Sequence, residues 1–533
     1  MTKNIKLLLL VALTVVACNK KDDDVVAITN SSDGLPLTAG TANFSKYVAV
    51  GNSLSAGYSD GALFKEAQKT SWTAILADQF KLVGGGEFKI PFMADNVGGF
   101  LNPDGTQNAN FGPRLYFNTL IPPSLGGAAP NTLPMTSSAA NSTVLTGGFN
   151  NMGVPGAKVF HLNVAGYGYA NPYFGRFAST PLAKIIDDAV AQSPTFFSLW
   201  IGNNDVLSYA STGGTGVDRL GDFNPAGYGL NDITDPIVFK GAYSQLLNDA
   251  TGLRKNGAKG VLSNIPYVTS VPFFTRVPTN PVGPLPAANI AALNGLLGGL
   301  NTFFAGAPFN DATPRFATLT TNDNPLLIVD ESLPSREAAI TLALAPTFGA
   351  LSAQVGKILA FARHARKTPG DRDYVLLSTS GVIGKTINDP ANPNTTVVDV
   401  PAAPIFPSFS TLGVSYPLQD RHVLTADETL KVKNATDAYN VTIKTFADQY
   451  GLAFVNANSI LASLSTGGYT SNGYTVKADY VTGGGFSLDG VHPSPRGYAV
   501  LANEFIKSIN TTYGSNLKGV NLGDYRILFP KNL

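Results

Sequence analysis

The sequence predicts an α/β fold in which helices cover both faces of a parallel sheet. Short apolar runs of strand type alternate with helix-type segments along most of the 533 residues, and such alternation is typical of βαβ units. At 44% hydrophobic residues the chain can bury a large core. Charged residues make up only 14%, whereas glycine and proline number 55 and 35. This composition indicates long loops between apolar elements.

The predicted strands are apolar runs over residues 46–50, 195–201, 260–265 and 452–455. The first run ends at Gly51 and immediately presents Ser53 before a turn rich in serine and glycine. The run over 195–201 is mostly apolar and is typical of a buried strand.

The predicted helices cover residues 71–80, 181–192, 235–257, 425–451 and 494–509. Asp235 before Pro236 is an N-cap with proline at the first helical position, and Gly257 is placed to end that helix. Thr425 and Glu428 form a capping box at the start of the fourth helix. Each of these signals fixes a helix end by local hydrogen bonding.

The alternation is interrupted once, over residues 267–424. This Pro-rich segment contains helical pieces at 287–304 and 350–366 and an apolar run at 374–377. We interpret it as an insertion that packs against the sheet domain and could cover the site. The expected domain is therefore built from residues 44–266 and 425–533.

The first residues predict export and lipid attachment. Two lysines precede the apolar residues 7–17, a stretch far shorter than the ~20 residues needed to span a bilayer. Val15-Val-Ala-Cys18 resembles the lipobox of bacterial lipoproteins, and the Lys-then-Asp run over 20–24 resembles the export signal of Bacteroidetes surface lipoproteins. These resemblances imply a signal peptide over 1–17, a lipidated Cys18 and a polar tether over 18–43. We expect a bacterial protein that is lipid-anchored at the outer membrane or cell surface; a plain secretory signal is the alternative.

Composition argues against several other functions. The formal net charge is +1 and no basic stripe is present, so we expect no nucleic-acid partner. Cys18 is the only cysteine, which excludes a catalytic thiol, a zinc–thiolate site and an intramolecular disulfide. The carboxylates of the motifs are scattered along the chain, so we expect neither a metal nor another cofactor.

Ser53 lies where a hydroxyl can be exposed at the end of a strand. Ligands of open parallel sheets bind beyond the carboxyl ends of the strands. Taken alone, the stretch is equally consistent with an ordinary strand-to-loop corner. A serine nucleophile requires a histidine base, a group that orients the histidine, and donors for an oxyanion.

Asp489 and His492 are candidates for the orienting acid and the base. They are three residues apart with Gly490 between them, so one turn can bring the carboxylate to the imidazole Nδ1. A purely structural turn is the alternative. The other histidines, His161, His364 and His422, lack a following helix start or an acid at this spacing.

Two further turns offer hydrogen-bond donors. Asn204, within Gly202-Asn-Asn-Asp205, could direct a side-chain amide at developing negative charge. Gly156 could bring a backbone N–H close to a reacting centre because it has no Cβ. Both could equally be ordinary tight turns.

Four stretches together resemble, in this order, the sequence blocks of the SGNH (GDSL-like) hydrolase family: Gly51–Leu54, Asn151–Gly156, Gly202–Asp205 and Asp489–His492. The resemblance implies a three-layer α/β/α sandwich with a flavodoxin-like parallel sheet, here with large loop insertions. It also implies hydrolysis of carboxylic esters without a metal.

By motif position, the resemblance makes Ser53 the nucleophile and Asp489 and His492 the rest of a catalytic triad. Gly156 and Asn204 would join the Ser53 amide as oxyanion donors. The expected function is a serine esterase or lipase acting on small-molecule or glycan esters. The alternatives are a surface polysaccharide deacetylase or acyltransferase, and a non-catalytic binding lipoprotein on the same scaffold.

Two features depart from the family pattern. Asn52 stands where the family usually has Asp, which keeps the size of the side chain but removes a charge. The separation of the third and fourth blocks is far larger than a compact member needs. The acyl chain, the alcohol portion of the substrate and the oligomeric state therefore stay open.

Overall fold

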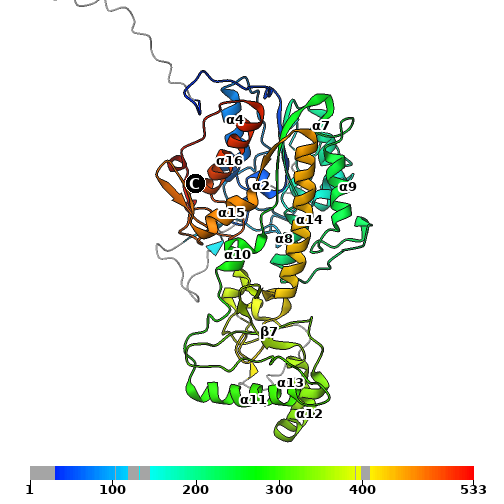
Figure 1. Ribbon diagram of the computed structural model, residues 1–533, viewed down its shortest axis with the longest axis vertical. Helices are drawn as coiled ribbons and strands as arrows, with labels where there is room; N and C mark the ends of the chain where they lie inside the picture. The colour runs from blue at the N-terminus through cyan, green and yellow to red at the C-terminus, as the bar shows by residue number, and fades with distance from the viewer. Residues whose placement is uncertain (1–30, 103, 118–130, 133–144, 391, 398–408) are drawn as a thin grey trace, which may run out of the picture.

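The computed structural model describes residues 31–533 except 103, 118–130, 133–144, 391 and 398–408. Two lobes lie one above the other in Figure 1: an α/β lobe and a smaller lobe built from the insertion. The predicted signal peptide, Cys18 and the tether up to residue 30 lie outside the described residues.

The α/β lobe is organised around five parallel strands in the spatial order β4-β1-β5-β6-β13. Their bounds are β1 Tyr47–Gly51, β4 Asn151–Gly153, β5 Phe196–Trp200, β6 Lys259–Ser263 and β13 Ala453–Val455. In chain order this is 2-1-3-4-5, the order of flavodoxin-like sheets. After β1, the chain adds β4 on one side of β1 and then β5 on its other side. The strand order therefore changes direction between β1 and β5, and their carboxyl ends flank the position where such sheets bind ligands.

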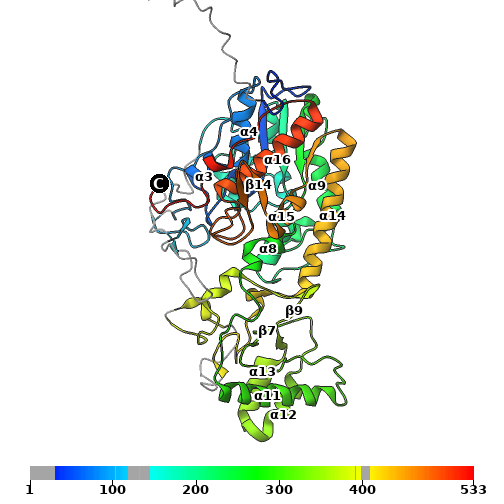
Figure 2. The same cartoon turned by 60° about the vertical axis from the view of Figure 1, so that its left-hand side comes forward.

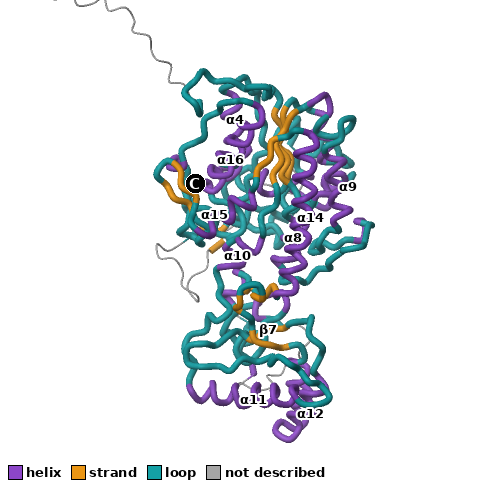
Figure 3. Tube along the Cα trace, viewed as in Figure 1, coloured by secondary structure: helices purple, strands orange, loops and turns teal. Residues whose placement is uncertain are grey.

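Helices cover both faces of this sheet, as the sequence predicts (Figures 1 and 3). One face carries α4 Trp72–Lys81 and α16 Pro495–Tyr513, and the other carries α9 Pro236–Leu246 and α14 Ala426–Tyr450. Trp72 stacks on Phe505 at 4.1 Å between ring centroids, which joins the first pair. Phe239 stacks on Tyr439 at the same distance and joins the second. Large aromatic side chains thus fill both helix–helix contacts.

Local capping explains the starts of α9 and α14. Asp235 Oδ1 accepts hydrogen bonds from two amides of the first turn of α9, and the Thr425–Glu428 capping box opens α14. Two predictions are wrong. The helical piece expected over 350–366 ends at Leu359, and residues 362–364 form strand β8. In addition, α9 ends at Leu246, not at Gly257. Asn248 accepts from the amides of the second and third residues after it, which gives the backbone an alternative to the helix.

The insertion lobe has a hydrophobic core of its own (Figure 2). It contains α11 Ala287–Ala305, α12 Glu337–Phe348 and α13 Ser352–Leu359, and its core begins at Val277. Within the described ranges one segment, Glu337–Leu359, is long and apolar enough to cross a membrane by length and composition. In the structure this segment is interrupted over 349–351, and α12 packs against α13.

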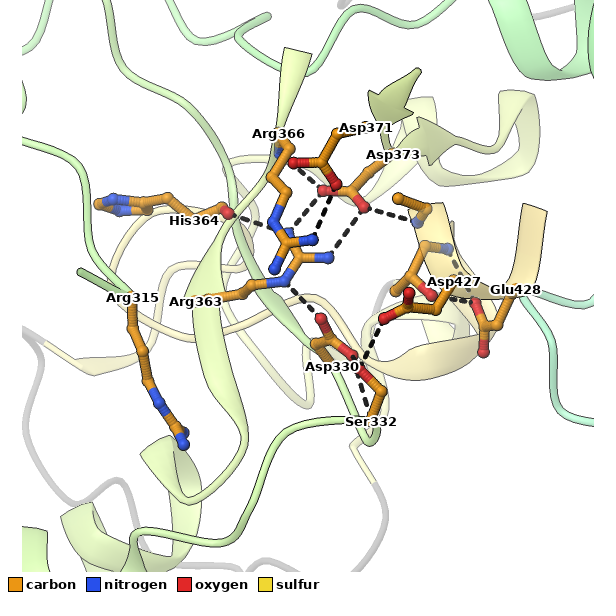
Figure 4. A network of polar contacts seen from close by, with 12 residues as sticks. Arg315, Asp330, Ser332, Arg363, His364, Arg366, Asp371, Asp373, Asp427 and Glu428 are labelled. Carbon is orange, nitrogen blue, oxygen red and sulfur yellow. Dashed lines mark hydrogen bonds and ion pairs between the residues drawn. The ribbon is translucent and has the colours of Figure 1, made fainter. Parts of the chain in front are cut away.

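A buried ion network connects the insertion lobe to α14 (Figure 4). Arg363 is 3% exposed and forms an ion pair with Asp330. Its guanidinium also donates two hydrogen bonds to the Asp373 carboxylate, at 2.6 and 2.8 Å. Asp373 Oδ1 also accepts from the amide of Ala426, the first residue of α14, at 3.0 Å. The lobe is therefore fixed to the long helix that packs along the sheet.

Candidate active site

Ser53 occupies the first position of a four-residue helix, α2 Ser53–Ala56, and only Asn52 separates it from the end of β1. A Cβ on Gly51 would lie 2.3 Å from Ser55 Oγ and 2.4 Å from the Trp200 carbonyl oxygen, so only glycine fits at the end of the strand. Asn52 caps the helix by accepting from the Leu54 amide at 3.0 Å. This tight corner holds Ser53, 6% exposed, in the wall of a cavity.

The structure brings Ser53, His492 and Asp489 together. Ser53 Oγ lies 2.8 Å from His492 Nε2, and His492 Nδ1 lies 2.9 Å from Asp489 Oδ2. The other carboxylate oxygen accepts from the Val491 and His492 amides, both at 2.8 Å. Gly490 has a φ of +72°, a conformation that favours glycine and lets this short turn close.

Asp489 is held in its ionised form although it is buried. Burial alone would raise its pKa, but attraction to His492, hydrogen bonds from the His492 ring and amide, and the Val491 amide outweigh burial and lower the pKa below its ordinary value. The Gly61 amide donates a further hydrogen bond to Oδ2 at 2.9 Å. The carboxylate can therefore keep a hydrogen on Nδ1 and leave Nε2 free to accept from Ser53.

Asp60 braces the loop that carries the acid. Its Oδ1 accepts from the Leu488 amide at 2.9 Å, and its own amide donates to Ser487 Oγ at 2.9 Å. Burial raises the pKa of Asp60 to about 7; the Leu488 amide opposes this rise and Asp489 adds to it. Asp60 and Gly61 could not be identified as site residues from the sequence, because no local pattern marks contacts with residues more than 400 positions away.

The other histidines differ from His492 in how Nδ1 is used. In each of His161, His364 and His422, Nδ1 accepts from a backbone amide, the donors being Lys158, Ala317 and Gln419. Burial lowers the pKa of each to about 4. An Nδ1 that accepts a hydrogen bond cannot donate to an orienting carboxylate, so these three rings lack the arrangement found at His492.

Asn204 and Gly156 lie beside the same strand ends. Asn204 is the first residue of α8 Asn204–Ser211; it lines the cavity with Ser53, and its Nδ2 donates to the Ala157 carbonyl at 2.9 Å. One amide hydrogen of Asn204 is thus used and the second is left for a ligand. Gly156 has a φ of +78° and is exposed, but it does not itself line the cavity.

The backbone places the Gly156 turn against the end of β1. The Val154 amide donates to the Gly51 carbonyl at 3.0 Å, and Asp205 Oδ2 accepts from the Val159 amide at 2.9 Å. In the described part of the chain, the amides of Ser53 and Gly156 donate to no acceptor. Both remain available for a bound oxygen.

Asn52 connects the ends of β1 and β5. While its oxygen caps α2, its Nδ2 donates to Asn203 Oδ1 at 3.0 Å, and both residues are buried. An ionised Asp at position 52 could keep the cap but could not donate to Asn203. The amide at position 52 therefore has a hydrogen-bond partner at position 203.

A largely apolar cavity adjoins Ser53. Its walls come from α8, residues 266–271, α15 Ala457–Thr466, the Asp489 loop and α16. Over the described ranges, no group of three or more His, Cys, Asp or Glu side chains could hold a metal ion. Comparison of the chain with protein-family models, curated proteins and solved structures found no match.

Proposed function

We propose that this chain is a serine ester hydrolase of the SGNH type. The observation that carries the proposal is the continuous hydrogen-bond chain from Ser53 Oγ through His492 to the ionised Asp489. Ser53 and His492 are 439 residues apart in sequence, yet their reacting atoms are 2.8 Å apart. The 2-1-3-4-5 sheet order, which the family resemblance implies, gives further support.

In the first half of the reaction, Ser53 attacks the ester carbonyl carbon while His492 Nε2 takes the hydroxyl proton. The carbonyl oxygen becomes an oxyanion, which accepts hydrogen bonds from the Ser53 amide, Asn204 Nδ2 and the Gly156 amide. The carbon–oxygen bond to the alcohol then breaks, and His492 returns its proton to the departing alcohol. The product of this half is an acyl ester on Ser53 Oγ.

In the second half, water repeats the attack. His492 takes a proton from the water as its oxygen bonds to the acyl carbon, and the same three donors hold the oxyanion. When the bond to Ser53 breaks, His492 returns the proton to Ser53 Oγ and the carboxylic acid leaves. Asp489 stays ionised throughout and stabilises the transient imidazolium.

A fluorophosphonate probe that reacts with activated serines tests this function. Wild type is expected to be labelled and to hydrolyse p-nitrophenyl esters, and Ser53→Ala is expected to lose both. Ser463→Ala is a matched control, because Ser463 is exposed on α15. Absence of labelling in wild type, or equal labelling in Ser53→Ala, would reject the hydrolase and favour a binding role for the same scaffold.

We further propose that Cys18 carries lipid and holds the enzyme at the bacterial surface. The lipobox resemblance at Val15–Cys18 supports this proposal. Expression of the full chain with an alkyne-bearing fatty acid is expected to label wild type but not Cys18→Ser. Equal labelling of both proteins would contradict it.

A further inference from the structure

We infer that the cavity beside Ser53 binds the acyl chain of the substrate, and that the substrates are esters of fatty acids longer than acetate. The inference rests on the proposed function, because it takes Ser53 as the point of attack. It discriminates between the two ester classes that the sequence leaves open, acetylated glycans and longer acyl esters.

The chemistry of the walls points to a hydrocarbon ligand. Ile460, Leu461 and Leu464 of α15 line the cavity together with Val268 and Val271 from the segment that follows β6. These side chains carry no hydrogen-bonding groups. The hydroxyl groups of a sugar placed here would lose their water without gaining partners, whereas a methylene chain loses nothing by leaving water.

Several polar atoms at the cavity already form hydrogen bonds within the protein. The Trp200 indole N–H donates to the Asn264 carbonyl at 3.0 Å, so this large ring presents only its apolar surface. Asn203 Oδ1 accepts from Asn52, and Asn204 Nδ2 donates one hydrogen to Ala157. The remaining polar capacity is concentrated around the Ser53 hydroxyl, where an ester carbonyl would lie.

The reacting groups and the apolar walls are continuous. Leu54 follows the nucleophile directly, Val491 and Pro493 flank His492, and all three line the cavity. The acyl chain of an ester bonded to Ser53 Oγ would therefore contact apolar side chains of the cavity from its first methylene group onward.

Leu464 marks a boundary of the apolar space. It lines the cavity and also a neighbouring polar pocket to which Lys477 and Asp479 contribute. A chain that extends past Leu464 would meet charged groups. A bulkier side chain at position 464 would shorten the space open to the acyl group.

The test is the dependence of kcat/KM on chain length, using p-nitrophenyl esters from acetate to palmitate and acetylated xylan as the glycan. For wild type we expect kcat/KM to rise about fourfold per added methylene until the cavity is full, since each buried methylene contributes ~0.8 kcal/mol. Leu464→Trp is expected to lower the octanoate-to-acetate ratio at least tenfold. Val268→Phe, at another position in the cavity lining, is a second variant with the same expectation. Ser463→Ala should leave the ratio unchanged.

Each outcome decides between the possibilities. A flat wild-type profile, or a maximum on acetate or acetylated xylan, would overturn the inference while leaving the hydrolase in place. Failure to hydrolyse any ester, together with no fluorophosphonate labelling, would overturn the proposed function itself. The wild-type profile decides the question even if a variant fails to fold.

Discussion

Replacing Asp489 with Asn tests how the site keeps His492 in its working state. Asp489 Oδ2 accepts from the Gly61 amide and from His492 Nδ1, both at 2.9 Å, while Oδ1 accepts from the Val491 and His492 amides at 2.8 Å. Asn offers one acceptor oxygen and one NH2 group. If the oxygen stays with the two adjacent amides, the NH2 group faces Gly61 and the imidazole.

This substitution has two consequences. His492 changes tautomer, because its Nδ1 must accept from the new NH2 group; the hydrogen moves to Nε2, which can no longer take the Ser53 proton. A triad disabled in this way is expected to lose about 10⁴-fold in kcat, or ~5 kcal/mol of transition-state stabilisation. The Gly61 amide loses its acceptor in a partly buried position, which lowers the free energy of unfolding by about 1–3 kcal/mol.

The assay is steady-state hydrolysis of a p-nitrophenyl ester at pH 7.5, combined with urea unfolding of the same preparations. Asp479→Asn serves as the control, because this exposed carboxylate lies in the same C-terminal segment and its activity should stay within about twofold of wild type. If Asp489→Asn kept kcat within tenfold of wild type while Ser53→Ala was inactive, the tautomer argument would be refuted.

Three further predictions concern single side chains. Asn204→Ala should lower kcat about 10²–10³-fold by removing an oxyanion donor; unchanged kcat would show that Asn204 is not a donor. Burial raises the pKa of Asp60 from 3.8 to about 7, so the folded protein binds more protons than the unfolded chain between these values and its stability falls as pH rises. In urea unfolding, the free energy of unfolding of wild type relative to Asp60→Asn should fall by at most ~4 kcal/mol between pH 4 and pH 8. A difference in unfolding free energy that does not change with pH would contradict this. Arg363→Met should lower the free energy of unfolding by about 3–5 kcal/mol, because it leaves two buried carboxylates without their ion-pair partner. Arg366→Met removes a partly exposed ion pair and should lower the free energy of unfolding by at most ~1 kcal/mol.

The sheet shows where sequence patterns succeed and where they fail. The parallel sheet covered on both faces is confirmed, and the four predicted strands correspond to β1, β5, β6 and β13. The sequence analysis did not identify β4 as a strand, because Asn151-Met-Gly153 has neither β-branched residues nor an apolar run. Gly153 is needed there because a Cβ would lie 2.3 Å from the Ala56 amide nitrogen, a contact that no local pattern reveals.

At the site, the sequence by itself determined the groups whose geometry is local. The Asp489–His492 turn, the strand-to-helix corner at Ser53 and the helix caps depend on hydrogen bonds between residues a few positions apart, which short motifs encode. The tertiary structure alone decided that Ser53 meets His492, that Gly61 and Asp60 support the acid loop, and that α15 closes an apolar cavity. These contacts join segments up to 439 residues apart. They follow from the order and packing of the strands, which residue spacing does not specify.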